Sequence, residues 1–103
     1  MEKDYYDVVG VDFYAPTQNY GPLSFWYDYV YELTEAKKPI ALTENGPIPD
    51  PDVLQNTKTY WLWFMPWWGR FTTDGNINSF EHLRKVYNHP YVITLDKFDL
   101  FRR

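Results

Sequence analysis

One stretch decides how the rest of the chain is interpreted: Lys38-Pro39-Ile40-Ala41-Leu42-Thr43-Glu44-Asn45-Gly46. Residues 39–43 are short, apolar and partly β-branched, which is typical of a buried strand. Glu44 follows directly, and Asn45-Gly46-Pro47 then breaks the chain. A carboxylate at the carboxyl end of a buried strand has an apolar wall behind it and an open loop in front. Catalytic groups of parallel α/β barrels lie at such positions, but on this stretch alone Glu44 is equally well a solvated loop residue.

The composition favours one small globular domain. The chain has 103 residues, and 45% of them are hydrophobic, which argues against disorder. The net charge of −4 argues against a nucleic-acid-binding surface. Because cysteine is absent, neither a disulfide framework nor thiolate chemistry is expected. Nothing in the sequence indicates a metal or an organic cofactor.

Aromatic residues make up 21% of the chain, with five Trp and ten Tyr, which exceeds the need of a small core. Surplus Trp and Tyr usually line a flat amphipathic surface, such as a sugar platform, an interface or a nucleobase stack. The polar start, residues 1–4, predicts no secretory signal in this chain. The longest aromatic run, residues 60–68, is too short to span a bilayer and is interrupted by Pro66.

Strand-like and helix-like segments alternate along the chain. The predicted strands cover residues 7–15, 39–43 and 60–68, and the first two predicted helices cover 23–36 and 53–58. The third helix is expected to have Asn78 as N-cap and Glu81 at the third helical position, and to run to about Tyr87. Three β-α units with short connections predict an α/β fold with a parallel sheet and right-handed crossovers.

The first predicted strand has two apolar faces until its far end. Alternation places Val9, Val11 and Phe13 on one face. Asp12 and Tyr14 lie two residues apart on the other face, where they could point into a site. A strand-end Asp that caps a loop amide and a Tyr that covers a core edge would give the same pattern.

The aromatic stripe of the first helix is expected to pack in the core, whereas the inward face of the third predicted strand is expected to remain uncovered in this chain. One face of the third predicted strand is expected to carry Trp61, Trp63, Met65 and Trp67. Pro66 marks the end of that strand or a bulge, because central strand positions tolerate proline badly. The first helix is expected to bury Leu23, Trp26, Tyr27, Val30 and Leu33, and the last helix Phe80, Leu83, Val86 and Tyr87. The candidate site residues all fall at the carboxyl ends of predicted strands, which favours a functional role for Glu44.

Several stretches resemble the C-terminal part of glycoside hydrolase family 26 β-mannanases. They are residues 7–14 (DVVGVDFY), 38–46 (KPIALTENG) and 61–69 (WLWFMPWWG), and residues 83–96 are similar to the family's ending. The resemblance covers nearly the whole chain in order and spacing, and the second stretch is the most specific. It implies a (β/α)8 TIM barrel that hydrolyses internal β-1,4-mannosidic bonds with retention. Residues 1–103 would then be the last three βα units, strands six to eight, of a single catalytic domain.

The resemblance also implies roles for individual residues. Glu44 matches the nucleophile at the end of the seventh strand. Tyr14 matches a tyrosine that closes the sixth strand and lies against the nucleophile, and Asp12 matches an aspartate near the site. Trp67 matches the tryptophan that forms the floor of the sugar subsite, with Trp68 as a second candidate for that position.

The chain lacks one group that the reaction requires. Retaining glycosidases need two carboxyl groups about 5–5.5 Å apart, and in this family the acid/base Glu lies at the end of the fourth strand. Glu32, Glu35 and Glu81 lie in helices that should pack outside a barrel. We therefore expect a fragment that is inactive alone, with a mannan or related β-linked polysaccharide as substrate.

The expected partners and location follow from the same resemblance. Open strand edges should lead the chain to bind the missing N-terminal part of the barrel or to self-associate. The full-length family member is expected to be secreted or at the cell surface. One alternative is a non-catalytic, aromatic-rich module that binds β-glycans by ring stacking. A flavodoxin-like fragment has little support, because no Gly-rich phosphate turn follows any predicted strand.

Overall fold

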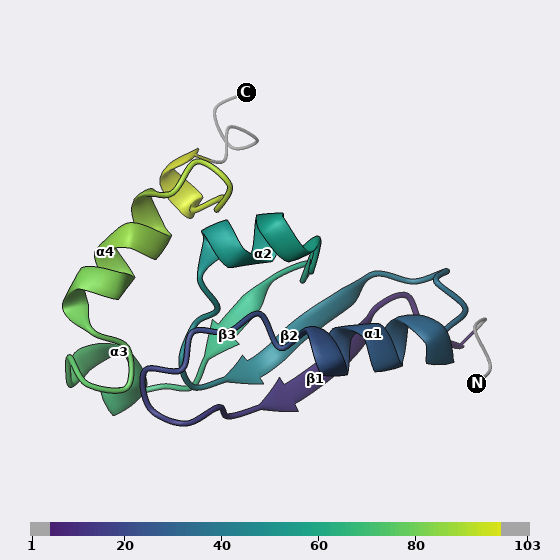
Figure 1. Cartoon of the computed structure of the whole chain (residues 1–103), viewed down its shortest axis with the longest axis horizontal. Helices are drawn as coiled ribbons and strands as arrows, with labels where there is room; N and C mark the ends of the chain where they lie inside the picture. The colour runs from purple at the N-terminus through teal and green to yellow at the C-terminus, as the bar shows by residue number, and fades with distance from the viewer. Residues whose placement is uncertain (1–4, 98–103) are drawn as a thin grey trace.

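The computed structural model describes residues 5–97 and contains a parallel three-stranded sheet. Its strands, in spatial order, are β1 (Val9–Phe13), β2 (Ile40–Asn45) and β3 (Phe64–Pro66). Both neighbouring pairs are parallel, and the three arrows of Figure 1 point the same way. The predicted α/β class and parallel sheet are confirmed.

Helical segments follow each strand. They are α1 (Ser24–Leu33), α2 (Pro51–Thr57), α3 (Arg70–Thr73), α4 (Phe80–Asn88) and the 3-10 turn η2 (Leu95–Lys97). Figure 1 shows α1 alongside β1 and β2, whereas α3 and α4 lie at the opposite end of the view. Within residues 5–97, no helix combines the length and the hydropathy that crossing a membrane requires.

The helices cover one face of the sheet. The main core cluster comprises Val30, Ile40, Leu42, Leu54 and Trp61, with Val9, Val11, Leu23 and Tyr27 packed against it. A smaller cluster under α4 comprises Ile48, Val86 and Val92. On the opposite face of β1, Gly10 and Asp12 are exposed. The sheet therefore has an apolar side under the helices and an open side that carries polar groups.

The predicted third strand is wrong in its length and in its facing. Only Phe64–Pro66 is strand, and Trp61 is 8% exposed in the core under the helices, whereas Met65 is 54% exposed. The indole Nε1 of Trp61 donates a hydrogen bond to the Pro22 carbonyl at 2.9 Å. The side chains from Trp61 to Met65 do not alternate strictly between the two faces, because the residues before Phe64 are not in a β-strand.

The ends of the helices also differ from the prediction. Ser79, and not Asn78, is the N-cap of α4, with its hydroxyl accepting from the His82 amide at 3.0 Å. Phe80 and Tyr87, which were expected to be buried, are 59% and 40% exposed, whereas His82 is buried.

In α1 the predicted stripe is confirmed for Leu23, Tyr27 and Val30, which pack in the core. Trp26 and Leu33, at 37% and 47% exposed, were wrongly expected to be buried. The short helix α3 lies between the third predicted strand and the last predicted helix, where the sequence predicts neither a strand nor a helix.

A bulge in β2 decides which way its last residues point. Val11 pairs with Leu42, but the next partner of β1, Asp12, pairs with Glu44, so Thr43 is an extra residue. Without this shift, Glu44 would share a face with Leu42, which is buried under the helices. With it, Glu44 turns to the open face beside Asp12, as bulges re-aim side chains near sites.

Candidate active site

The carboxyl ends of β1 and β2 bring Tyr14 and Glu44 together. The Tyr14 hydroxyl donates a hydrogen bond to Oε1 of Glu44 at 2.7 Å. Burial of the hydroxyl, this hydrogen bond and the negative charges of Glu44 and Asp12 together raise the pKa of Tyr14 to about 12. Tyr14 therefore stays protonated at neutral pH and remains a donor to the carboxylate.

Asp12 lies beside this pair but binds a different partner. Its Oδ1 accepts a hydrogen bond from the Thr43 hydroxyl at 2.6 Å. Thr43 in turn lies over Gly10, where an added Cβ would approach its Cγ2 to 2.5 Å. Glycine at this position leaves room for the bulged Thr43, which orients Asp12 next to Glu44 in the register of the two strands.

The carboxylates of the site have neutral donors as partners. Within residues 5–97, neither Glu44 nor Asp12 forms an ion pair, and Tyr14 is the hydrogen-bond partner of Glu44. This hydrogen bond is made to Oε1 of Glu44. No group of three or more His, Cys, Asp or Glu side chains in this described range could hold a metal ion.

The loop that follows Glu44 is held by two buried asparagines. Asn45 is fully buried, and its Oδ1 accepts from the Met65 amide at 2.9 Å. Its Nδ2 donates to the carbonyls of Gly46 at 3.3 Å and Pro47 at 3.2 Å. Asn78 reaches the same loop from the start of α4.

The two tryptophans predicted for the sugar subsite follow β3 directly. The Trp67 amide donates to the Asn45 carbonyl at 2.9 Å, which continues the sheet pairing one residue beyond β3. The side chain of Trp67 is 42% exposed and that of Trp68 is 76% exposed. Trp67 is thus tied to the residue next to Glu44, whereas Trp68 projects further into solvent.

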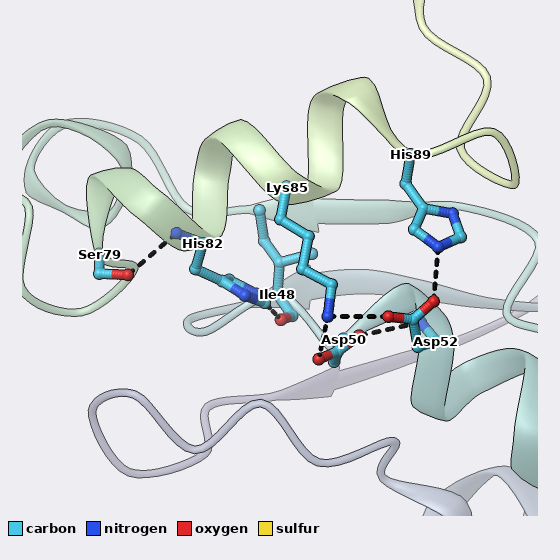
Figure 2. Close-up of polar contacts among 7 residues, drawn as sticks. All are labelled: Ile48, Asp50, Asp52, Ser79, His82, Lys85 and His89. Carbon is cyan, nitrogen blue, oxygen red and sulfur yellow. Dashed lines mark hydrogen bonds and ion pairs between the residues drawn. The ribbon is translucent and has the colours of Figure 1, made fainter.

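A second polar cluster fastens α4 to the start of α2 (Figure 2). Lys85 Nζ lies 2.9 Å from Asp50 Oδ2 and 2.9 Å from Asp52 Oδ2, and His89 Nε2 lies 2.7 Å from Asp52 Oδ1. Burial alone would raise the pKa of Asp50, but the hydrogen bonds from Lys85 and from the Asp52 amide outweigh it and lower this pKa. Hydrogen bonds from Lys85 and His89 lower the pKa of Asp52. The two aspartates also raise the pKa of Lys85.

His82 in the same helix is buried and bonded to backbone. Its Nε2 lies 2.7 Å from the Ile48 carbonyl, and its ring stacks on Tyr20 with centroids 3.5 Å apart. Burial lowers the pKa of His82, so the neutral ring donates to this carbonyl. Figure 2 shows His82, Lys85 and His89 reaching from α4 toward the segment 48–52.

One apolar cavity lies apart from Asp12, Tyr14 and Glu44. It is a groove of about 880 Å³ between β3, α2, α4 and the segment 91–96. Its walls are mostly aromatic and aliphatic, with Trp63, Phe64, Tyr87 and Tyr91 among them. Asp12, Tyr14 and Glu44 do not line it, so the candidate site is the open face of the sheet and not this groove.

Sequence reasoning predicted Asp12, Tyr14 and Glu44 but missed the groups that hold them. The sequence predicts Asn78 as a helix cap and Thr43 as an ordinary strand residue, and it predicts no helix around Phe71. The short polar-aromatic loop after residue 69 has no periodicity that would indicate buried contacts. A bulge likewise leaves no reliable mark in a single sequence.

Comparisons with known proteins agree with the expected resemblance. The model of glycosyl hydrolase family 26 matches residues 2–97. A mannan endo-1,4-β-mannosidase of Thermothelomyces thermophilus is 42% identical over 94 residues, which cover 91% of this chain and 19% of that protein. The chain thus spans about a fifth of the length of this curated relative.

Solved structures give the same result. The Podospora anserina GH26-CBM35 β-(1,4)-mannanase superposes with a TM-score of 0.89 at 37% identity, over 97% of this chain and 22% of that chain. A β-mannanase from a symbiotic protist of the termite Reticulitermes speratus, complexed with gluco-manno-oligosaccharide, superposes with a TM-score of 0.81 at 29% identity. That match covers 91% of this chain and 28% of that chain. Sequence, fold and these matches together show that the chain belongs to glycosyl hydrolase family 26.

Proposed function

We propose that this chain is the nucleophile-bearing part of a retaining endo-β-1,4-mannanase, with Glu44 as the nucleophile. The observation that carries the proposal is the Tyr14–Glu44 hydrogen bond of 2.7 Å at the carboxyl ends of two neighbouring parallel strands. Active sites of parallel α/β barrels lie at this end of the strands. The mannanases among the relatives support the substrate class.

In the proposed reaction, an oxygen of Glu44 attacks the anomeric carbon of a mannosyl unit and forms a covalent ester. The glycosidic bond breaks, and the leaving oxygen takes a proton from a second carboxylic acid. A water molecule then attacks the same carbon, gives its proton to that second carboxylate, and releases Glu44. Tyr14 donates to the ionised Glu44 before attack, which favours the form that a nucleophile needs.

Two further side chains are proposed to contact the sugar. One carboxylate oxygen of Asp12 accepts a hydrogen bond from Thr43, and the other can accept a hydrogen bond from a sugar hydroxyl. The half-exposed ring of Trp67 offers a flat apolar plate for a sugar ring, and Trp68 extends the same surface. The solved relative with a bound gluco-manno-oligosaccharide supports a polysaccharide as the substrate.

The sheet of this chain is proposed to be completed by five further βα units to a (β/α)8 barrel. Such barrels have about 250 residues and eight strands, whereas this chain supplies three strands. The groove beside β3 is apolar and open, and we propose that the remaining part of the barrel packs there. A protein that contains the whole barrel is proposed to act on mannan outside the cell or at its surface.

The acid/base group is proposed to come from that remaining part, so the isolated chain should not hydrolyse mannan. General acid–base assistance contributes about 10²–10⁴-fold in rate, and most walls of the cleft would be absent as well. Purified chain should release no reducing ends from soluble mannan. Turnover at ordinary enzyme rates would contradict the assignment of the acid.

The isolated chain should also sediment as associated species at micromolar concentration. In the described part of the chain, β1 and β3 are the edge strands of the sheet, and unpaired strand edges favour association.

The decisive experiment completes the barrel and traps the intermediate. The five preceding βα units of the Podospora anserina relative are fused to this chain, and the chimera is treated with a 2-fluoro-mannosyl reagent. Mass spectrometry of a digest should find the label on the peptide that contains Glu44. Glu44→Gln should prevent labelling, whereas Glu81→Gln, on the exposed side of α4, should not. Label on Asp12 would remove the assignment.

The same chimera also tests the alternative function. The exposed rings of Trp67 and Trp68 would equally serve a β-glycan-binding module without catalysis. Binding of mannan that depends on Trp67 but is accompanied by neither labelling nor turnover in the completed barrel would favour that module.

A further inference from the structure

The side chain of Asn78 uses its full hydrogen-bonding capacity inside the protein. It is completely buried. Its Oδ1 accepts from the Ile48 amide at 2.7 Å, and its Nδ2 donates to the carbonyls of Gly46 at 3.0 Å and Phe71 at 2.9 Å. An amide is the one side-chain group of this size that can accept once and donate twice in this way.

These three bonds join parts of the chain that are far apart in sequence. Gly46 and Ile48 belong to the loop that leaves Glu44, and Phe71 belongs to α3. Asn78 itself lies just before α4, 32 positions after Gly46. Because all three partners are backbone groups, the bonds hold the path of the loop and of α3, whatever their side chains are.

The ring of Tyr14 contacts Phe71 and lies next to the backbone of Gly46. The rings of Phe71 and Tyr14 meet edge to face, with centroids 5.6 Å apart and planes at 61°. A Cβ added on Gly46 would lie 3.4 Å from Cδ2 of Tyr14 and 3.7 Å from the Phe71 ring. Tyr14 is 42% exposed, so these two neighbours limit how its ring can turn.

We propose that Asn78 is a positioning residue that holds Tyr14 in hydrogen-bonding geometry to Glu44 through Gly46 and Phe71. The inference rests on the proposed function, because it assigns to Asn78 the alignment of the nucleophile's donor. Asn78 does not touch the sugar or the reacting atoms. Its effect falls on the step in which Glu44 attacks, and small displacements of reacting groups can cost about 10²-fold in rate.

The test variant is Asn78→Asp in the completed barrel. This change keeps the size of the side chain and the acceptor for the Ile48 amide, but it removes both N–H donors. A protonated carboxyl can still donate to one carbonyl, whereas an ionised one repels both. We expect labelling by the 2-fluoro-mannosyl reagent to slow by about 10- to 100-fold with little change in its binding constant. The deficit relative to the parent should grow as pH rises.

A matched control separates positioning from loss of stability. Ser79→Ala removes the cap of α4 one residue away, which typically costs about 1 kcal/mol of stability, but does not alter the contacts of Tyr14. The direct readout is the ¹³Cζ resonance of Tyr14 at neutral pH, identified by its loss in Tyr14→Phe. Glu44→Gln gives the position of this resonance when the carboxylate is absent. We expect Asn78→Asp to shift the resonance toward that position and Ser79→Ala to leave it unchanged.

The outcomes are distinguishable from failure of the proposed function. If the parent chimera is not labelled on Glu44, the proposed function fails, and the Tyr14 resonance alone decides the role of Asn78. If Asn78→Asp leaves both the labelling rate and the resonance unchanged, the positioning role is wrong. If Asn78→Asp does not fold, Phe71→Leu replaces it, since it removes the ring contact and keeps the Phe71 carbonyl. A folded Phe71→Leu with an unmoved Tyr14 resonance overturns the inference.

Discussion

The chain holds two pairs of neighbouring carboxylates that differ in their partners. Asp50 and Asp52 at the start of α2 lie 2.9 Å from the Lys85 ammonium, and Asp52 also binds His89. Asp12 and Glu44 at the strand ends bind only hydroxyl groups among the described residues. The ammonium of Lys85 lies between the two carboxylates of the first pair, whereas within residues 5–97 no cation lies against the second pair on the open side of the sheet.

This difference separates structural carboxylates from candidate catalytic ones. A cation lowers the pKa of its partner and holds it in place, which fastens α4 to α2. A neutral donor such as Tyr14 orients a carboxylate without cancelling its charge. The carboxyl ends of β1 and β2 therefore place two carboxylates where a sugar could bind. In the outer cluster of Asp50, Asp52 and Lys85, the charges hold α4 against α2.

The sharpest test exchanges one carboxylate in each pair for its amide. In the completed barrel, Glu44→Gln should lower kcat by about 10⁴-fold or more, in the range found when nucleophiles are removed. The matched variant Asp52→Asn should retain kcat within about twofold, because its carboxylate lies in the α2–α4 cluster. Steady-state kinetics on soluble mannan gives both values. Comparable losses in the two variants would abolish the distinction between the pairs.

A second test removes the neutral donor. Tyr14→Phe should lower kcat by about 10- to 100-fold, since a hydrogen bond to a charged group is lost, while KM changes little. The contact of its ring with Phe71 is kept, so the fold should be unaffected. Since the pKa of Tyr14 is raised to about 12, the donor stays protonated throughout the working range. The expectation would be contradicted if the activity of the parent fell between pH 8 and 10 and the activity of Tyr14→Phe did not.

A third test concerns the pH dependence of stability near α4. The pKa of His82 is lowered by burial below its ordinary value of 6.5. The unfolded chain therefore binds a proton at a higher pH than the folded one, so stability is complete above pH 6.5 and is lost as pH falls below it. For the uptake of one proton, the free energy of unfolding should fall by at most about 1.4 kcal/mol for each pH unit. In His82→Gln this slope should flatten, as measured by urea unfolding from pH 5 to 8.

The smallest effect is expected for the cation of the outer cluster. Lys85→Met should lower the thermal midpoint at pH 7 and leave kcat within about twofold. Both aspartates have a lowered pKa, so their pairing stabilises the fold above the ordinary value of 3.8 and is lost as pH falls through the folded values. The midpoints of parent and variant should therefore converge as pH drops below about 4. A gap that stays constant into acid would show that Lys85 acts through packing and not through charge.

The site residues could be predicted from the sequence, but the residues that hold them in place could not. Asp12, Tyr14 and Glu44 could be singled out because each polar group interrupts an apolar strand pattern at its end. Alternation predicts a shared face for Trp61 and Met65, which is wrong because side chains alternate regularly only where the backbone is extended. The sequence also predicts Asn78 as a helix cap, because asparagine occurs both at N-caps and at buried positions where its amide binds backbone groups.

The sequence by itself determined the α/β class, the order of the elements and the family, because these depend on local periodicity and on a specific stretch, residues 38–46. Tertiary structure alone decided that Glu44 faces the open side. By alternation Glu44 would follow Leu42 into the core, and only the pairing with β1, shifted by one residue at Thr43, turns it beside Asp12. Register between strands is a relation between distant segments. Here it depends on the fit of Thr43 over Gly10 and on the loop held by Asn45 and Asn78.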